Sequence, residues 1–305
     1  MEIAFVVATY RRPEVLAVCL EAICNQELPE GTSIQVRVYD NGSPKSAEST
    51  VRPWAESHGV VYINNGVGHG LGYSLTRGAR ESQGDVVVEM NDDAIIPQGF
   101  VARVADAFGN QPRLGILGFR ADEDGYQEVP GGIGQIDGPG MRLIGNFCRP
   151  TSGPIAVEHV YGFCYAWRRA ILDEGLGHDP TLLTKDFSNG SRLDTDHSLT
   201  VLRGGWQVIY DGSLPVRHLA MPRGDMSEVS TRWRINDIRN TLYLYLKHFG
   251  LFGRSALALR YGLLFNHGIL SALRQPTRAN WVFFLAGLRG RASAVRFYVQ
   301  HLLGG

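Results

Sequence analysis

The chain has 305 residues, of which 44% are hydrophobic, 20% charged and 10% aromatic, and thirty Lys and Arg balance thirty Asp and Glu. This apolar content excludes an intrinsically disordered chain, and the length suits one large α/β domain with extensions or two domains. The four cysteines lack CxxC and metal-ligand spacing, which argues against a disulfide framework or structural zinc and favours a reducing, cytoplasmic compartment. No basic lead or cleavage motif opens the sequence, so we expect no secretory signal.

The balanced charge hides an uneven distribution along the chain. Residues 229–305 carry eleven basic side chains and one acidic side chain, Asp237, for a net charge of +10, so residues 1–228 carry −10. We therefore expect a catalytic domain over residues 1–228 and a basic, apolar C-terminal region over residues 229–305 that contacts an anionic surface. We expect no nucleic acid as a partner.

The first two-thirds of the chain alternate between strand and helix patterns. Short apolar runs bounded by turn residues predict strands, and apolar residues at helical spacing predict helices. The expected strands are 3–8, 34–39, 60–63 and 85–90, and the expected helices are 14–25 and 74–82. This alternation predicts an α/β fold with a doubly wound sheet and helices on both of its faces.

The following part of the chain is less regular. Residues 120–160 are rich in Gly and Pro, which predicts a long loop or an irregular hairpin of the kind that often carries function. Beyond it we expect a strand over 158–167, helices over 168–174 and 199–203, and two short edge strands over 205–210 and 215–218.

Polar side chains gather at three predicted strand ends, namely Thr9 to Arg12, Asp40 to Asn41, and Asn91 to Asp93. Asp and Asn are ordinary turn formers, but three such ends together favour a ligand site, because doubly wound sheets bind ligands beyond the carboxyl ends of their strands. Two adjacent carboxylates after a buried strand favour a hard divalent cation that also contacts phosphate. The Gly-rich stretch 66–72 matches neither a P-loop nor a dinucleotide fingerprint, which argues against ATP or nicotinamide.

In this order, the motifs resemble those of inverting glycosyltransferases of the GT-A fold, family 2, and most closely the non-processive rhamnosyl- and galactosyl-transferring members. The resemblance covers about residues 1–218 and implies a doubly wound mixed sheet. The matching segments are the opening strand and turn (7–13), the "VDNGS" segment (38–43), the Gly-rich loop and helix (68–78), the metal-binding segment (89–93), the acceptor-side strand (161–169), the "EDVDLSL" segment (193–199) and the closing strands (205–218).

The resemblance implies a role for each matching residue. Asp194 would be the general base, Asp93 and His218 would hold Mn²⁺ or Mg²⁺, and Asp40 would contact the pyrimidine base of the donor. The donor nucleotide would contact Ala8, Thr9, Tyr10, Arg12, Asp40, Gly70, Asn91 and Asp92. The acceptor side would include Gly162, Phe163 and Asp196.

The implied reaction is one displacement with inversion, from a UDP- or dTDP-sugar to a hydroxyl of a cell-surface polysaccharide or a lipid-linked glycan precursor. The chain departs from the family pattern at Gly68, Thr76, Asn91 and Leu193, which leaves open a nucleotide-binding scaffold protein on a degenerate transferase fold. A sugar-nucleotide nucleotidyltransferase also stays open, although residues 9–13 match poorly the Gly-rich loop that follows the first strand of such enzymes.

The C-terminal region has no run of about 18 uninterrupted apolar residues, so we expect no membrane span. Val229 stands where processive synthases have the Gln of their QxxRW motif, which favours a non-processive enzyme. Leu and Phe interspersed with Arg and Lys predict helices that lie on an anionic membrane, which would place the protein peripherally on the inner face of the cell membrane. A helical subdomain or a homodimer interface is the alternative.

Overall fold

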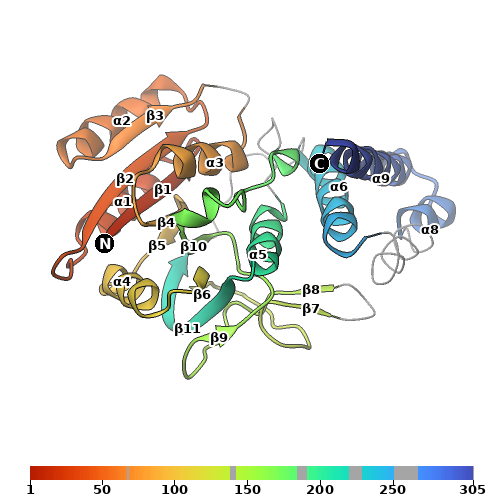
Figure 1. The fold of residues 1–305 in the computed structure, drawn as a ribbon. Helices are drawn as coiled ribbons and strands as arrows, with labels where there is room; N and C mark the ends of the chain where they lie inside the picture. Colours follow the sequence, from red (N-terminus) through yellow and green to blue (C-terminus); the bar gives the residue numbers. More distant parts are fainter. Residues whose placement is uncertain (67–68, 138–141, 184–190, 220–228, 251–266, 305) are drawn as a thin grey trace.

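The computed structural model describes residues 1–66, 69–137, 142–183, 191–219, 229–250 and 267–304 (Figure 1). Gly68, one of the departures from the family pattern, and the expected domain boundary at residue 228 lie outside these residues. The division of the chain into two domains therefore stays a prediction.

Nine strands of the described residues form one mixed sheet in the order β3–β2–β1–β4–β10–β6–β11–β5, with β9 beside β11. The strands are β1 (Glu2–Thr9), β2 (Ser33–Asp40), β3 (Val61–Asn64), β4 (Val86–Asn91), β5 (Ala94–Ile95), β6 (Leu114–Asp122), β9 (Ile155–Ala156), β10 (Cys164–Arg168) and β11 (Gln207–His218). β10 is antiparallel to β4 and β6, and β5 and β9 are antiparallel to β11. The remaining neighbours are parallel, as the apolar character of the first strands predicts.

Helices cover both faces of the sheet, which confirms the predicted architecture. One face packs against α1 (Pro13–Cys24), α2 (Lys45–Ser57) and α4 (Phe100–Asn110), and the other against α3 (Leu71–Glu81) and α5 (Leu193–Arg203). Alternate residues of β1 enter the two cores, Phe5 on the first face and Val6 on the second. A Cβ at Gly78 would collide with the side chains of Val6 and Tyr39, so glycine lets α3 approach the sheet closely.

Several predicted elements differ from the observed ones. β10 begins only at Cys164 rather than at 158, and just before it the amide of Gly162 donates to the Asp194 side chain instead of to a neighbouring strand. The helix predicted over 168–174 is a short 3₁₀ turn, Arg169–Leu172. The two predicted edge strands form one strand, β11, which lies inside the sheet and is interrupted by a bulge between Asp211 and Pro215.

The sequence also left several elements unassigned and placed two helix starts too late. α2, α4, β5 and β6 had no prediction, α3 begins at Leu71 rather than at 74, and α5 begins at Leu193 rather than at 199. Within 120–160, β7 (Gln135–Asp137) and β8 (Arg142–Ile144) form a two-stranded antiparallel hairpin, as the irregular-hairpin prediction allowed.

Three described C-terminal helices, α6 (Val229–Phe249), α8 (His267–Arg274) and α9 (Arg278–Gly304), gather at one end of the molecule beside α5, away from β2 and β3 (Figure 1). This confirms the helical C-terminal extension. α9 packs on α6 through Ala286, Gly290 and Ala294, and a Cβ at Gly290 would lie 2.8 Å from the carbonyl oxygen of Ile235. Among the described helices, none combines the length and the apolar character that crossing a membrane requires.

Candidate active site

The sheet brings the three polar strand ends together at one edge. The chain runs from β1 outward through β2 to β3 and then returns to place β4 on the other side of β1, which makes β1 and β4 a topological switch point. In the ladder Thr9 pairs with Asp40, and Ala8 pairs with Asn91. The sequence-based expectation that these ends meet is therefore confirmed.

Asp92 is fully buried in this edge and is held by two side chains. The hydroxyl of Thr9 donates to its Oδ2 over 2.7 Å, and Arg12 donates from Nε to Oδ2 over 3.2 Å and from Nη2 to Oδ1. Burial lowers the pKa of Arg12, but the attraction of Asp92 and Asp93 outweighs it and raises the pKa above its ordinary value. Arg12 is thus a permanent positive charge at the strand ends.

Asp93 lies between Arg12 and His218. Arg12 Nη1 donates to Asp93 Oδ2 over 2.8 Å, and His218 Nε2 lies 3.8 Å from Asp93 Oδ1. The backbone reinforces this contact, because the amide of Leu219 donates to the carbonyl oxygen of Asp93 over 3.0 Å. On the far side of the imidazole, His218 Nδ1 lies 2.9 Å from Glu123 Oε2. An ionised carboxylate only accepts, so Nδ1 carries the proton of this bond, and Nε2 is the ring nitrogen that could bind a cation.

The pair of Asp93 Oδ1 and His218 Nε2 fits two ligands of a divalent cation. A carboxylate oxygen and an imidazole nitrogen suit Mn²⁺, and the carboxylate of Glu123 orients the imidazole as second-shell partners of metal sites do. The described residues hold no group of three or more His, Cys, Asp or Glu side chains that could form a complete site. A divalent cation at this pair would need further ligands besides these two side chains.

Asp40 occupies the end of β2 but is fully buried. Its Oδ1 accepts from the amide of Ser43 over 2.8 Å, and its Oδ2 accepts from the hydroxyl of Tyr62 over 2.5 Å. Burial, followed by the neighbouring Asp40 carboxylate, raises the pKa of Tyr62, so this phenol remains a donor. Contact between Asp40 and a donor base would require Ser43 or Tyr62 to share an oxygen.

The remaining donor-side residues surround this edge. Asn91 pairs with Ala8 in the ladder, and its Oδ1 has no hydrogen-bond partner among the described residues. Gly70 has an extended backbone and precedes α3, which has no side-chain cap at its N-terminus. Tyr10 stacks under the guanidinium of Arg11, which lies 4.8 Å from the ring centroid.

Asp194 meets the acceptor-side segment in the first turn of α5. The amide of Gly162 donates to Asp194 Oδ2 over 2.8 Å, and a Cβ at position 162 would lie 3.0 Å from the Asp194 side chain. Asp194 is half-buried, and its Oδ1 accepts no hydrogen bond from the part of the chain that the structure describes. The next residue, Phe163, accepts the amide of Asn91 over 2.8 Å and has its ring 4.9 Å from that of His218. Two consecutive residues therefore connect Asp194 to the Asp93–His218 pair.

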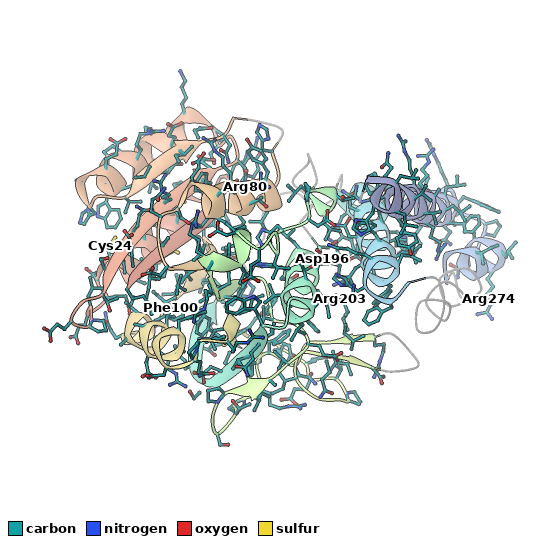
Figure 2. The ribbon with its side chains drawn as sticks, viewed as in Figure 1. Cys24, Arg80, Phe100, Asp196, Arg203 and Arg274 are labelled. Atoms are coloured by element: carbon teal, nitrogen blue, oxygen red, sulfur yellow. The ribbon has the colours of Figure 1, made fainter. Side chains whose placement is uncertain are left out.

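Asp196, which we expected on the acceptor side, lies elsewhere. It is fully buried between α5 and α6, as Figure 2 shows. Lys247 Nζ lies 2.8 Å from its Oδ2, and His248 Nε2 lies 2.7 Å from its Oδ1. Lys247 also pairs with Asp179 over 2.9 Å. Asp196 thus anchors the C-terminal helices and does not face an acceptor.

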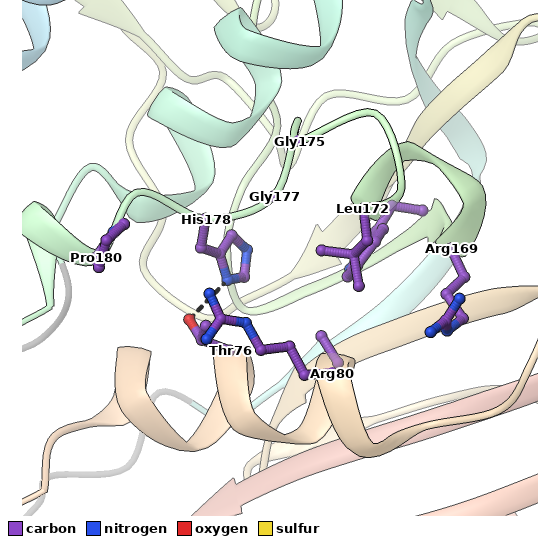
Figure 3. Close-up of a pocket in the computed structure, with 10 residues that line it drawn as sticks. Thr76, Arg80, Arg169, Leu172, Gly175, Gly177, His178 and Pro180 are labelled. Carbon is purple, nitrogen blue, oxygen red and sulfur yellow. Dashed lines mark hydrogen bonds between the residues drawn. The ribbon is translucent and has the colours of Figure 1, made fainter. Parts of the chain in front are cut away.

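A cavity of 410 Å³ lies away from the strand ends, between α3 and the segment after β10 (Figure 3). Its lining includes Arg80, Trp167 and His178. Below it, His178 Nε2 lies 2.9 Å from the hydroxyl of Tyr165 and 3.3 Å from the fully buried Glu89, whose pKa burial raises. These groups bond one another inside the fold, so we assign the candidate chemistry to the strand ends and not to this cavity.

Sequence reasoning missed Glu123, Tyr62 and Lys247, each of which fixes a residue that it did find. Glu123 belongs to a run of acids in a turn, Asp122 to Asp124, which looks like ordinary surface sequence. Tyr62 and Lys247 act across 22 and 51 residues of chain respectively, on Asp40 and Asp196. No local pattern carries such a signal.

The profile of glycosyl transferase family 2 matches residues 4–175, which is more than half of the chain and includes β1 to β4. The chain belongs to glycosyl transferase family 2. A curated relative, the dolichol-phosphate mannosyltransferase of Pyrococcus furiosus, is 25% identical over 180 residues, or 59% of this chain and 49% of the relative. The chain thus spans about half the length of the curated relative it matches.

Several solved structures share the fold. Mannosyltransferase PcManGT from Pyrobaculum calidifontis, in complex with GDP-Man and Mn²⁺, has a TM-score of 0.59 at 17% identity and covers 96% of this chain and 86% of its own. GalNAc-T7 with UDP, GalNAc and Mn²⁺ has a TM-score of 0.61 at 16% identity, with coverage of 80% and 47%. TarS 1-349 from S. aureus has a TM-score of 0.60 at 11% identity, with coverage of 98% and 89%. These neighbours support the GT-A fold predicted from the motifs.

Proposed function

We propose that this protein transfers a sugar, with inversion, from a UDP- or dTDP-sugar to an acceptor hydroxyl. The observation that carries the proposal is the placement of Asp194. The amide of Gly162 fixes one oxygen of its carboxylate, the other accepts no hydrogen bond from the described residues, and the same segment joins Asp194 to the Asp93–His218 pair. An inverting displacement requires a base beside the attacking hydroxyl and positive charge beside the leaving phosphate.

In this proposal the residues divide the reaction between them. Asp194 Oδ1 takes the proton of the acceptor hydroxyl as that hydroxyl attacks the anomeric carbon, while Gly162 keeps the carboxylate oriented. Arg12 contributes fixed positive charge beside the leaving diphosphate. A divalent cation held by Asp93 and His218, with Mn²⁺ as the first candidate and Mg²⁺ as the second, would supply Lewis-acid stabilisation of that leaving group.

The identity of the nucleotide base in the sugar donor is the more specific part of the proposal. Among the structural neighbours are complexes with UDP and a complex with GDP-Man, so the neighbours leave the base open. We assign a pyrimidine because Asp40, at the end of β2, offers a carboxylate that can accept the N3–H of uracil or thymine. Its Oδ1 and Oδ2 each have one lone pair beyond the bonds from Ser43 and Tyr62.

A panel of nucleotide sugars tests the donor assignment. Thermal shift with Mn²⁺ should show stabilisation by UDP- or dTDP-sugars and little by GDP-sugars, since a ligand that binds only the native state raises Tm. Asp40→Asn should weaken pyrimidine diphosphate binding by roughly 1–3 kcal/mol, because an amide nitrogen would face a donor in the site. Stabilisation by GDP-mannose alone would overturn the pyrimidine assignment.

The proposed acceptor is a hydroxyl of a cell-surface polysaccharide or a lipid-linked glycan precursor. The basic C-terminal region favours a substrate carried on an anionic membrane, and we place the protein peripherally on the inner face of the cell membrane. Product analysis with lipid-linked and soluble acceptors tests whether the acceptor is carried on a membrane. Transfer to soluble acceptors only would remove the membrane from the proposal.

A scaffold protein on a degenerate transferase fold remains the competing proposal, because Asn91 and Leu193 replace acids of the family pattern. Slow hydrolysis of the preferred donor, measured with Mn²⁺ and without an acceptor, distinguishes a glycosyltransferase from a scaffold protein. An enzyme hydrolyses its donor, and Asp194→Asn provides the matched control. Formation of a nucleotide sugar from a nucleoside triphosphate and a sugar phosphate would instead support a nucleotidyltransferase.

A further inference from the structure

α9 exposes a continuous apolar stripe along its length. Its members recur at alternating spacings of four and three residues, so they share one face of the helix. They are Trp281, Leu285, Leu288, Ala292, Val295, Val299 and Leu302. The six large side chains of this stripe are 41–58% exposed, although apolar residues on helix faces are usually buried.

The opposite face of α9 packs against α6. Ala286 and Ala294 are buried against α6, and Phe297 packs in the same cluster as Tyr243. The guanidinium of Arg239 lies 5.2 Å from the ring of Phe297. Packing of α9 on α6 therefore does not account for the apolar stripe, which points away from that contact.

A row of positive charge runs along one edge of the stripe. Arg278, Arg289 and Arg296 are exposed and follow the stripe at helical spacing, and Arg274 is exposed at the end of α8 (Figure 2). α9 contains no Asp or Glu. The stripe is therefore flanked by charge of a single sign.

The positive charge beside the stripe distinguishes between two surfaces that could cover it, a second copy of the chain and an anionic lipid surface. The four-and-three spacing alone would suit a coiled coil with a second copy of the chain. In such a pair the positions beside the seam hold Arg289, Arg291 and Arg296, and a second copy would bring the same arginines against them with no acid to pair. An anionic lipid surface instead complements the arginines and receives the apolar side chains.

We propose that α9 lies in the interface of an anionic membrane, with the apolar stripe inserted and the row of arginines at the lipid phosphates. This deepens the membrane contact of the proposed function and rests on it for the lipid-linked acceptor. Since none of the described helices can span a bilayer, the helix lies along the surface.

Vesicle co-sedimentation of the full chain tests the surface. The protein should sediment with vesicles that contain phosphatidylglycerol, weakly with phosphatidylcholine alone, and less as salt rises. Acyl chains brominated near the headgroup should quench the fluorescence of Trp281, and Trp281→Phe should abolish that quenching. Quenching that persists in Trp281→Phe would place another part of the protein in the membrane and overturn the proposal.

Two sets of variants separate the apolar and charged contributions. Leu285→Gln, Leu288→Gln and Val295→Gln together should weaken vesicle binding about 100-fold or more. Arg289→Gln with Arg296→Gln should weaken it about 30-fold at low salt and much less at high salt. The matched controls carry equally exposed residues of the catalytic region, namely Val18→Gln, Leu28→Gln and Val61→Gln for the first set and Arg80→Gln with Arg142→Gln for the second.

The outcomes are distinguishable from those of the proposed function. Absence of sedimentation with anionic vesicles, or binding that the α9 variants leave unchanged, overturns this inference while donor binding measured by thermal shift stays intact. A dimer in light scattering without lipid that the triple α9 variant converts to monomer assigns the stripe to a second copy and also overturns it. Vesicle binding without donor binding contradicts the proposed function alone.

Discussion

Two regions of this molecule carry a closely spaced pair of acids, one after β4 and one at the start of α5. In each region one acid is fully buried and held by basic side chains, Asp92 by Arg12 and Asp196 by Lys247 and His248. The other acid of each pair faces the site, where Asp93 meets His218 and Asp194 meets Gly162. The two regions thus use the same division between an anchor and a site residue.

The two regions differ in what their anchors hold. Asp92 joins the first turn after β1 to the end of β4, so its ion pair shapes the site itself. Asp196 joins α5 to α6, so its contacts with Lys247 and His248 hold α6 against α5. Substitutions at the anchors should therefore affect stability, and substitutions at the site residues should affect catalysis.

The largest effect is expected at Asp93. Asp93→Ala should lower transfer by about 10³-fold or more, because a metal ligand contributes several kcal/mol of transition-state stabilisation. Added Mn²⁺ should not restore the activity, and EDTA should abolish transfer by the unmodified protein. The measurement is the initial rate of transfer across a metal titration.

The matched variant in this region is Asp92→Asn. It leaves the charge of Arg12 in a buried environment with one partner fewer, so we expect a lower Tm rather than a changed metal response. Full turnover of the unmodified protein in EDTA would show that Arg12 replaces the cation and would contradict the role of Asp93.

The second effect concerns the base. Asp194→Asn should lower turnover by about 10²–10⁴-fold, the usual contribution of a positioned base, while donor binding stays nearly unchanged. The amide can still accept the Gly162 N–H, so the local geometry is preserved. Single-turnover rates beside nucleotide affinity test this, and a larger catalytic loss in Asp196→Asn with unchanged Tm would transfer the role to Asp196.

Much of the first region could be predicted from the sequence, because local signals specify it. Apolar runs predicted β1, β2 and β4, and the polar residues after each run, Thr and Arg after the first and Asp and Asn after the others, predicted where the polar groups lie. Parallel strands bring such ends to one edge whatever their distance in the chain. The resemblance to a family then supplied the roles of Asp93 and Asp194.

The second region could not be predicted in the same way. Asp194 and Asp196 are two residues apart on one helix, and only tertiary packing sets which one meets α6. α2 and α4 were missed because Pro53 lies within the first and Gly109 near the end of the second, which obscures the helical pattern. Contacts between residues far apart in the chain decide which side chain each acid meets, and such contacts leave no periodic pattern in the sequence.

The third effect concerns the anchor on α5. Asp196→Asn should destabilise the protein by about 3–5 kcal/mol, since it removes the buried carboxylate that Lys247 and His248 share and leaves Lys247 with Asp179 alone. Urea unfolding should show a lower midpoint, and turnover per folded molecule should change little. The contrast with Asp194→Asn, which should retain stability, would sharpen the division between the two acids. Equal destabilisation by both variants would contradict it.

The smallest effect is a pH dependence at Asp179, the second partner of Lys247. Burial raises the pKa of Asp179, but the attraction of Lys247 outweighs it and lowers the pKa to about 2. The pKa in the unfolded chain is higher, about 3.9, so the pair stabilises the fold fully above pH ~4 and loses its effect as the pH falls toward ~2. This contribution is about 2 kcal/mol. The difference in unfolding free energy between the unmodified protein and Asp179→Asn should therefore shrink by that amount between pH 6 and pH 2. A difference that does not change with pH would show that Lys247 relies on Asp196 alone to hold α6 in place.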